Sequence, residues 1–258
     1  MNKPDFLSQS VSVFTNVRQT TEQLCSGLSS EDMAVQSMPD CSPAKWHLAH
    51  TTWFFENFVV QPGLPHYSPF NPDFHYLFNS YYVSEGERHA RPDRGLLTRP
   101  YLQEVLDYRQ HINGQITRLL ETGALDSKLL QVLVTGLHHE MQHQELLLSD
   151  ILHLFSCNPL QPAVRSPKLR ATTQSPPSTD GFSTYEGGLI DVGAAKPANP
   201  GWDDFHYDNE APRHKVWLED YRLQNRPISN QQWLEFMADG GYENPLLWLS
   251  DGWDCCQQ

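Results

Sequence analysis

The sequence predicts a mainly α-helical protein in which a four-helix bundle is followed by a smaller α+β part. Four long segments carry apolar residues at helical spacing. A stretch rich in proline and serine follows the fourth segment, and short strand-like runs separated by Gly, Pro and Asp come after it. We therefore expect a bundle domain at residues 1–158, a linker at 159–184 and a second domain at 185–258.

The helices of the bundle are predicted at residues 11–28, from Ser42-Pro43 to about Phe58, at 101–122 and at 127–155. In the second helix, Ser42 is expected as the N-cap and Pro43 in the first turn. Residues 61–100 show no sustained period, but their many aromatic side chains favour an ordered loop over disorder. Four helices with this long excursion suggest an up-and-down bundle.

The second domain is predicted to contain short elements. Residues 189–192 and 214–218 are expected to form strands, and residues 229–238 a helix capped by Ser229. So short a stretch of α+β structure gives little area from which to build a buried core.

Composition restricts the function classes. The formal net charge of −13 argues against non-specific binding to nucleic acid or to acidic membranes. No apolar run reaches the roughly 18 residues of a membrane-spanning helix, and the first ten residues lack the apolar stretch of a signal peptide. Five scattered cysteines predict a reducing, cytoplasmic location.

The fourth predicted helix carries a pair of histidines that could bind a metal. His139 and His143 lie four residues apart, which places their Cβ atoms about 5–6 Å from each other on one helix face. The pair could also be structural, satisfied by hydrogen bonds. It also matches the His-Glu-x-x-His motif of zinc proteases, with Glu140 as general base. That class needs a third ligand, and the usual downstream position holds Ser149.

A third interpretation is a mononuclear site completed from the second helix, which carries His47 and His50. Side chains from facing helices of a bundle can converge on one ion. Imidazole ligands suit iron, zinc or copper, and the residues alone do not choose among these metals.

Several motifs, in order, resemble one known family. Residues 42–56 (SPAKWHLAHTTWFFE) and 138–146 (HHEMQHQEL) resemble the two ligand helices of the ergothioneine-biosynthesis sulfoxide synthases (EgtB). Residues 88–100 (RHARPDRGLLTRP) resemble the substrate loop of that family. The segments at 205–214, 227–230 and 240–242 are similar to the start of its formylglycine-generating-enzyme-like domain. The resemblance extends from about residue 11 to residue 253.

The resemblance implies a DinB-like four-helix bundle joined to a formylglycine-generating-enzyme-like domain of the C-type-lectin class. It also implies Fe(II) held by three histidines, here His50, His139 and His143, with His47 in the core or beside a ligand. The implied reaction uses O2 to join the sulfur of γ-glutamylcysteine or cysteine to the imidazole C2 of hercynine, giving a sulfoxide.

The resemblance further assigns substrate contacts. Arg91 and Arg94 match the pair that holds the carboxylates of the thiol substrate, and Gln142 matches a hercynine contact. Guanidinium groups suit carboxylates because they bind them bidentately. The family's proton-donating tyrosine has no counterpart before residue 258, so no catalytic residue is assigned.

This mismatch leads us to expect that residues 185–258 form an incomplete domain and that the chain alone binds iron weakly and turns over poorly. Two alternative functions remain open. One is an ovothiol-type sulfoxide synthase acting on histidine, and the other is a non-catalytic metal-binding bundle.

Overall fold

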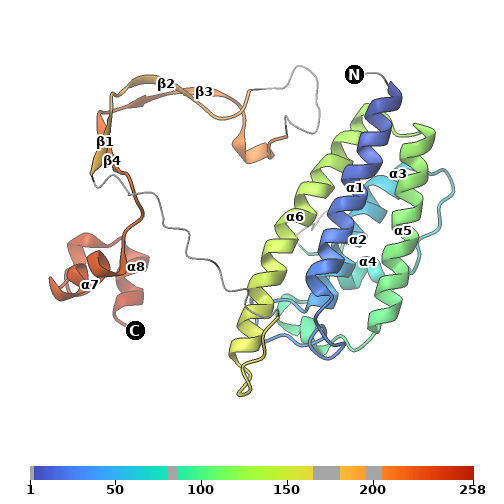
Figure 1. Cartoon of the computed structure of the whole chain (residues 1–258), viewed down its shortest axis with the longest axis horizontal. Helices are drawn as coiled ribbons and strands as arrows, with labels where there is room; N and C mark the ends of the chain where they lie inside the picture. Colours follow the sequence, from blue (N-terminus) through green and yellow to red (C-terminus); the bar gives the residue numbers. More distant parts are fainter. Residues whose placement is uncertain (1–2, 81–85, 165–180, 196–204) are drawn as a thin grey trace, which may run out of the picture. The chain divides into compact units, whose positions relative to one another are not determined.

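The computed structural model describes residues 3–80, 86–164, 181–195 and 205–258 (Figure 1). Most of the predicted linker at 159–184 lies outside the described residues. The chain divides into two compact units, residues 1–168 with 197–207, and residues 169–196 with 208–258. No described helix is both long enough and apolar enough to cross a lipid bilayer.

The first unit is built on four long helices: α1 (Lys3–Cys25), α2 (Ala44–Phe55), α5 (Leu102–Thr122) and α6 (Ser127–Ser156). Figure 1 shows α1, α5 and α6 lying side by side, and α1 and α2 each pack against both α5 and α6. The predicted four-helix bundle is therefore confirmed. The largest fully buried side chains include Phe14, Trp53, Phe55, Tyr108, Ile112 and Ile116.

The excursion between α2 and α5 is more ordered than a loop. The chain leaves α2 through a π-helical turn (Glu56–Val60) and the short helix α3 (Gln61–Gly63), then forms α4 (Asp73–Phe78). A 3-10 helix (Arg91–Leu96) completes its described part. The aromatic side chains that argued against disorder also pack into the core, since Phe74 and Phe78 are each 2% exposed.

Because of the excursion, α5 runs in the opposite direction to the one expected relative to α2. Near the start of α2, the Nζ of Lys45 donates to the carbonyl of Pro100, just before α5 begins. Just beyond the end of α2, Glu56 accepts a hydrogen bond of 2.5 Å from the hydroxyl of Tyr108, farther along α5. The two helices therefore run parallel, and the predicted up-and-down topology is wrong at this step, because the long connection returns the chain to the end where α2 started.

The predicted cap Ser229 is confirmed, since its side chain accepts a hydrogen bond from the amide of Gln232. A second cap was not predicted. Asp126 caps α6 by accepting a hydrogen bond of 2.8 Å from the amide of Leu129. The prediction that Ser42 caps α2 is wrong, since Pro43 is the N-cap residue. The Ser42 hydroxyl instead accepts a hydrogen bond of 2.8 Å from Arg94.

The second unit contains two antiparallel strand pairs. β1 (Phe182–Tyr185) pairs with β4 (Tyr221–Gln224), and β2 (Gly188–Val192) pairs with β3 (His214–Leu218). Helices α7 (Asn230–Ala238) and α8 (Ser250–Cys256) follow, together with 3-10 turns at Asp208–Glu210 and Pro245–Leu247. β2, β3 and α7 were predicted, whereas β1, β4 and α8 were not.

The second unit has little buried core. Among its described residues only Gly241 is buried, and large apolar side chains such as Trp217 (65%) and Leu234 (58%) are more than half exposed. This agrees with the small core expected for such a short α+β stretch.

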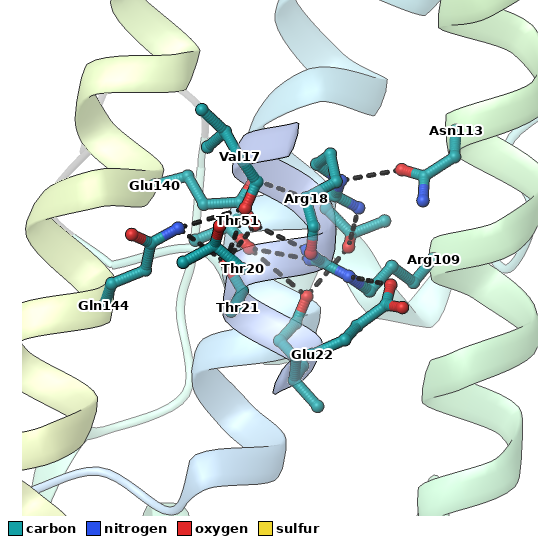
Figure 2. A network of polar contacts seen from close by, with 12 residues as sticks. Val17, Arg18, Thr20, Thr21, Glu22, Thr51, Arg109, Asn113, Glu140 and Gln144 are labelled. Carbon is teal, nitrogen blue, oxygen red and sulfur yellow. Dashed lines mark hydrogen bonds and ion pairs between the residues drawn. The ribbon is translucent and has the colours of Figure 1, made fainter. Parts of the chain in front are cut away.

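A buried ionic network connects the helices of the bundle (Figure 2). At its centre the Glu140 carboxylate of α6 accepts hydrogen bonds from Arg18 (2.8 Å), Arg109 (2.5 Å) and Thr21 (2.6 Å). Arg18 and Thr21 belong to α1 and Arg109 to α5. Arg18 also donates to Thr52 of α2 at 2.8 Å, so four helices share one network.

The network keeps Glu140 charged in the interior. Burial alone would raise the pKa of its carboxyl, but Arg109 and Arg18 hold that pKa at about 2. Removing one member of a buried ion pair typically costs about 3–5 kcal/mol, because the remaining charge is left uncompensated. Glu140 therefore fixes the rotation of α6 about its axis relative to α1 and α5.

A glycine sets the separation of α2 and α6. A Cβ atom added at Gly136 would lie 2.6 Å from the ring of Phe55 and 2.8 Å from that of Phe54. These distances are well inside van der Waals contact, so the two helices approach each other closely only because this side chain is absent. Gly136 precedes His139 by three residues, which is nearly one helical turn.

We predict that Glu140→Gln lowers the free energy of unfolding by about 3 kcal/mol or more, since it leaves Arg18 buried without a counter-charge and Arg109 with Glu22 alone. The folded pKa is depressed, so this contribution is complete above about pH 4.5 and is lost as the pH falls towards about 2. Urea unfolding followed by circular dichroism measures both effects. Glu145→Gln, at an exposed position of the same helix, should change stability by less than about 0.5 kcal/mol. Equal effects of the two substitutions would contradict the role given to Glu140.

Two glycine-to-alanine substitutions should act in opposite directions. Gly136→Ala should lower the free energy of unfolding by about 1–3 kcal/mol, because the added methyl overpacks the contact with Phe54 and Phe55. Gly114→Ala on α5 meets no atom within 4 Å and should raise it by about 0.5–1 kcal/mol through helix propensity. Thermal and urea unfolding of both variants test the pair, and stabilisation by Gly136→Ala would refute the close approach.

Candidate metal centre

Three histidines from two helices converge in the first unit. His139 and His143 extend from α6 towards His50 of α2, and the Nε2 atoms of His50 and His139 are 3.2 Å apart. One ring nitrogen from each of the three lies within 4.8 Å of the others. The ring centroids are 4.6–5.0 Å apart. The structure thus brings together the three side chains that the sequence motifs single out.

His50 is held in a fixed orientation. Its Nδ1 lies 2.6 Å from the carbonyl oxygen of Phe78, which can only accept, so Nδ1 carries the proton. Its ring stacks between Trp46, with centroids 4.5 Å apart, and Trp53, at 5.6 Å. The hydrogen bond and the stacking leave Nε2 unprotonated and directed at the other two histidines.

His47 and Asp150 lie behind His143. The Nδ1 atoms of His47 and His143 are 2.8 Å apart, and Nε2 of His47 lies 3.0 Å from the Asp150 carboxylate. The Ser42 amide also donates to Asp150 at 2.8 Å. Burial raises the pKa of the Asp150 carboxyl, but hydrogen bonds from His47 and Ser42 outweigh it and lower the pKa. His47 is thus beside the cluster rather than in it.

The electrostatics of the cluster fit a metal cation. Burial, and then the neighbouring histidines, lower the pKa of His50 and of His143 far below the usual value. Burial lowers the pKa of His139 to about 4. At neutral pH the three rings are therefore uncharged, which is the form that binds metals.

The hydrogen-bonding state of His139 points the same way. Its Nδ1 is buried and has no hydrogen-bond partner among the described residues. Its Nε2 faces the Nε2 of His50, which is an acceptor. A cation between the two Nε2 atoms would be bound by both rings in their neutral form, and Nδ1 of His139 would then carry the proton of that ring. Imidazole-only ligation suits iron, zinc or copper.

Glu140 lies outside this cluster although it stands between the two ligand-bearing positions in sequence. Its carboxylate is fully buried and bonded to Arg18, Arg109 and Thr21. A general base must reach a water on the metal, and this carboxylate is instead held by side chains of α1 and α5. The structure therefore argues against the zinc-protease interpretation.

The two predicted substrate arginines lie on the 3-10 helix of the excursion. The Arg94 guanidinium stacks over Trp46, 3.4 Å from the ring centroid, and bonds to the hydroxyls of Ser42 and Ser80. Arg94 is 5% exposed, and its positive charge contributes to the lowered pKa of His143. Arg91 lies farther out and donates to the carbonyl of Asp40.

The other predicted contact, Gln142, is exposed on α6, so its role stays a prediction. The neighbouring His138 stacks on Phe205, with centroids 3.8 Å apart and planes 6° from parallel. Phe205 belongs to the first unit although it opens a motif similar to the second domain of the family. The segment at 205–207 therefore packs on the helix that carries two of the histidines.

Sequence reasoning missed three groups of the site. Asp150 stands seven residues after His143, which is two helical turns, so helical spacing could have placed it on the same face. Trp46 is four residues before His50 on α2, at a spacing that brings the rings together. The Phe78 carbonyl has no signal in the sequence, because any residue supplies one.

Comparison with known families supports the two-part organisation. The DinB superfamily profile matches residues 14–147, more than half of the chain. The sulfatase-modifying factor enzyme 1-like domain matches residues 168–258.

Curated relatives align with more than half of the chain. The chain is 27% identical to a hercynine oxygenase of Mycolicibacterium smegmatis over 84% of this chain and 47% of the relative. It is 29% identical to the hercynine oxygenase of Mycobacterium tuberculosis over 86% of this chain and 49% of the relative. It is 24% identical to ergothioneine biosynthesis protein 1 of Neurospora crassa over 58% of this chain and 18% of the relative.

The chain spans about half the length of the two bacterial relatives. The bundle carries the converging histidines and is followed along the chain by the sulfatase-modifying-factor-like segment. The chain belongs to the DinB superfamily, and its two domains and its curated relatives support the EgtB family.

Proposed function

We propose that this chain provides the metal centre of a non-haem Fe(II), O2-dependent sulfoxide synthase of ergothioneine biosynthesis. The substrates are hercynine and γ-glutamylcysteine or cysteine. The observation that carries the proposal is the convergence of His50, His139 and His143 as neutral imidazoles from two helices. The names of the bacterial relatives supply the substrate class.

The proposed reaction balances with O2 as the only oxidant. A C–S bond forms between the imidazole C2 and the sulfur, while the C2–H and S–H bonds break. One oxygen atom is added to the sulfur, and the other leaves as water with the two hydrogens. The reaction reduces O2 by four electrons in total. When bound, Fe(II) would supply the site at which O2 accepts them.

The charges of the chain's own residues determine which further ligands a bound metal ion could accept. The three histidines are neutral and contribute no negative charge, so the positive charge of the ion remains available to an anionic thiolate. Glu140, the nearest carboxylate in sequence, is neutralised by two arginines and does not compete. The site is therefore suited to a thiol that ionises on binding.

Arg94 and Arg91 supply the positive charge that the carboxylates of the thiol substrate need in an acidic protein. Arg94 is already oriented by Trp46 and two serine hydroxyls, which reduces the entropy lost on binding. Gln142 is proposed as the hercynine contact. The five cysteines are all free, which supports a reducing, cytoplasmic setting for a thiol-using enzyme.

We predict that the purified chain, supplied with Fe(II), O2, hercynine and γ-glutamylcysteine, forms the C2-linked sulfoxide at a low rate, detected by mass spectrometry. His139→Ala should abolish the product because it removes one of the three ligands. Glu145→Ala, at an exposed site on the same helix, should leave the rate unchanged. A product linked at C5 of histidine would instead support the ovothiol-type activity. An iron-loaded protein that makes neither product would contradict the proposed function.

We predict that Arg94→Lys raises the KM for the thiol substrate by roughly 10-fold to 100-fold, because lysine keeps the charge but loses the bidentate geometry. The KM for hercynine should stay within about twofold. Arg99→Lys, at an exposed position near the end of the same excursion, is the matched control. Steady-state kinetics with each substrate varied in turn make the comparison, and an unchanged thiol KM would remove Arg94 from the substrate site.

A further inference from the structure

We propose that Asp150 and His47 are positioning residues that select the tautomer of His143, so that its Nε2 is the nitrogen presented to the metal. The three side chains form a chain of hydrogen bonds that leads from the backbone of Ser42, just before α2, to the histidine cluster. The inference rests on the proposed metal site but not on the identity of the substrates.

The first step is the assignment of the proton on His47. The Asp150 carboxylate accepts hydrogen bonds only, and it lies 3.0 Å from Nε2 of His47. Nε2 of His47 therefore carries a proton. His47 is 2% exposed, and a second proton on its ring would place an additional positive charge in the interior, so the ring carries one proton only.

The second step follows for His143. A neutral His47 protonated at Nε2 has an acceptor at Nδ1, and that atom is 2.8 Å from Nδ1 of His143. A hydrogen bond at this distance needs a proton between the two nitrogens, so Nδ1 of His143 carries it. Nε2 of His143 then has a free lone pair, and it is the nitrogen left to face His50 and His139.

His50 reaches the same tautomer by a different route. Its Nδ1 donates to the backbone carbonyl of Phe78, which a side-chain substitution cannot remove. His143 depends on two side chains instead. If Asp150 is lost, His47 can place its proton on Nδ1 and donate it to His143. His143 would then carry its proton on Nε2, where it blocks metal binding.

Asp150 is itself fixed by the protein. The oxygen that faces His47 also accepts a hydrogen bond of 2.8 Å from the Ser42 amide, just before α2. The carboxylate is thus tied to α2 while its own backbone belongs to α6. Outer groups of this kind typically change metal affinity by about 10-fold to 100-fold when they are removed.

The test measures tautomers and metal affinity separately. In metal-free protein labelled with ¹⁵N-histidine, NMR of the ring nitrogens should show the proton on Nδ1 of His143 and on Nε2 of His47. Asp150→Ala should move the proton of His143 to Nε2 and weaken Fe(II) and Co(II) binding by about 10-fold to 100-fold. Asp150→Asn, which keeps an acceptor oxygen, should restore much of both, whereas a general loss of folding would not be rescued in this way. Glu145→Ala removes an equal charge from the same helix and should change neither.

The proposal is overturned if wild-type His143 carries its proton on Nε2, a result that needs no variant to fold. It is equally overturned if Asp150→Ala leaves both the tautomer and the affinity within about twofold of wild type. Wild-type protein with the expected tautomers but no affinity for Fe(II) or Co(II) would refute the proposed metal site and, with it, the purpose assigned to these two residues.

Discussion

The bundle depends on one buried carboxylate. Glu140 lies between Arg18 and Arg109, and the three charges connect α6 to α1 and α5. A charged group in the interior is stable only with such partners, so the helix cannot rotate without leaving them unpaired. Because Glu140 lies next to His139 in sequence, the same constraint that holds α6 in place determines which way its histidines face. The ionic network and the histidine cluster therefore lie on neighbouring faces of one helix.

The second constraint is steric and acts between α2 and α6. Gly136 lets α6 approach the rings of Phe54 and Phe55, and this approach brings His50 within 3.2 Å of His139. The aromatic residues on either side of His50 then restrict its ring to one plane. Close packing and fixed ring planes produce a cluster that is already arranged before any ligand binds, which is what efficient metal binding requires.

Local patterns predicted the elements well, because helical spacing and caps act over a few residues. The fourth helix was expected at residues 127–155 and runs from Ser127 to Ser156. The strands at 189–192 and 214–218 were found with at most one residue of difference. The parallel arrangement of α2 and α5 could not be read in this way. It depends on where a 46-residue connection between Phe55 and Leu102 returns the chain, and that is decided by packing of its aromatic side chains.

The same distinction holds for the site. The His139–His143 pair follows from spacing on one helix, and motif resemblance supplied His50 from another. The hydrogen bonds that orient the rings were not foreseen, since they involve a backbone carbonyl at Phe78 and a pair of side chains 103 residues apart, His47 and Asp150. Ser42 shows how a local rule can fail. Its residue type suits a helix cap, but its hydroxyl bonds to Arg94 instead.

The separation of the ligands along the chain has a consequence for how the protein matures. His50 and His139 are 89 residues apart in sequence. An unfolded polypeptide would therefore have to close a large loop before both side chains could bind one ion. Only the adjacent pair on α6 is available early, and two imidazoles form a weak chelate. Binding of an ion at the proposed site would therefore follow docking of the helices, and it would stabilise the finished bundle by mass action rather than guide its formation. Scarcity of the ion in a growing cell would yield folded, empty protein that is ready to be loaded.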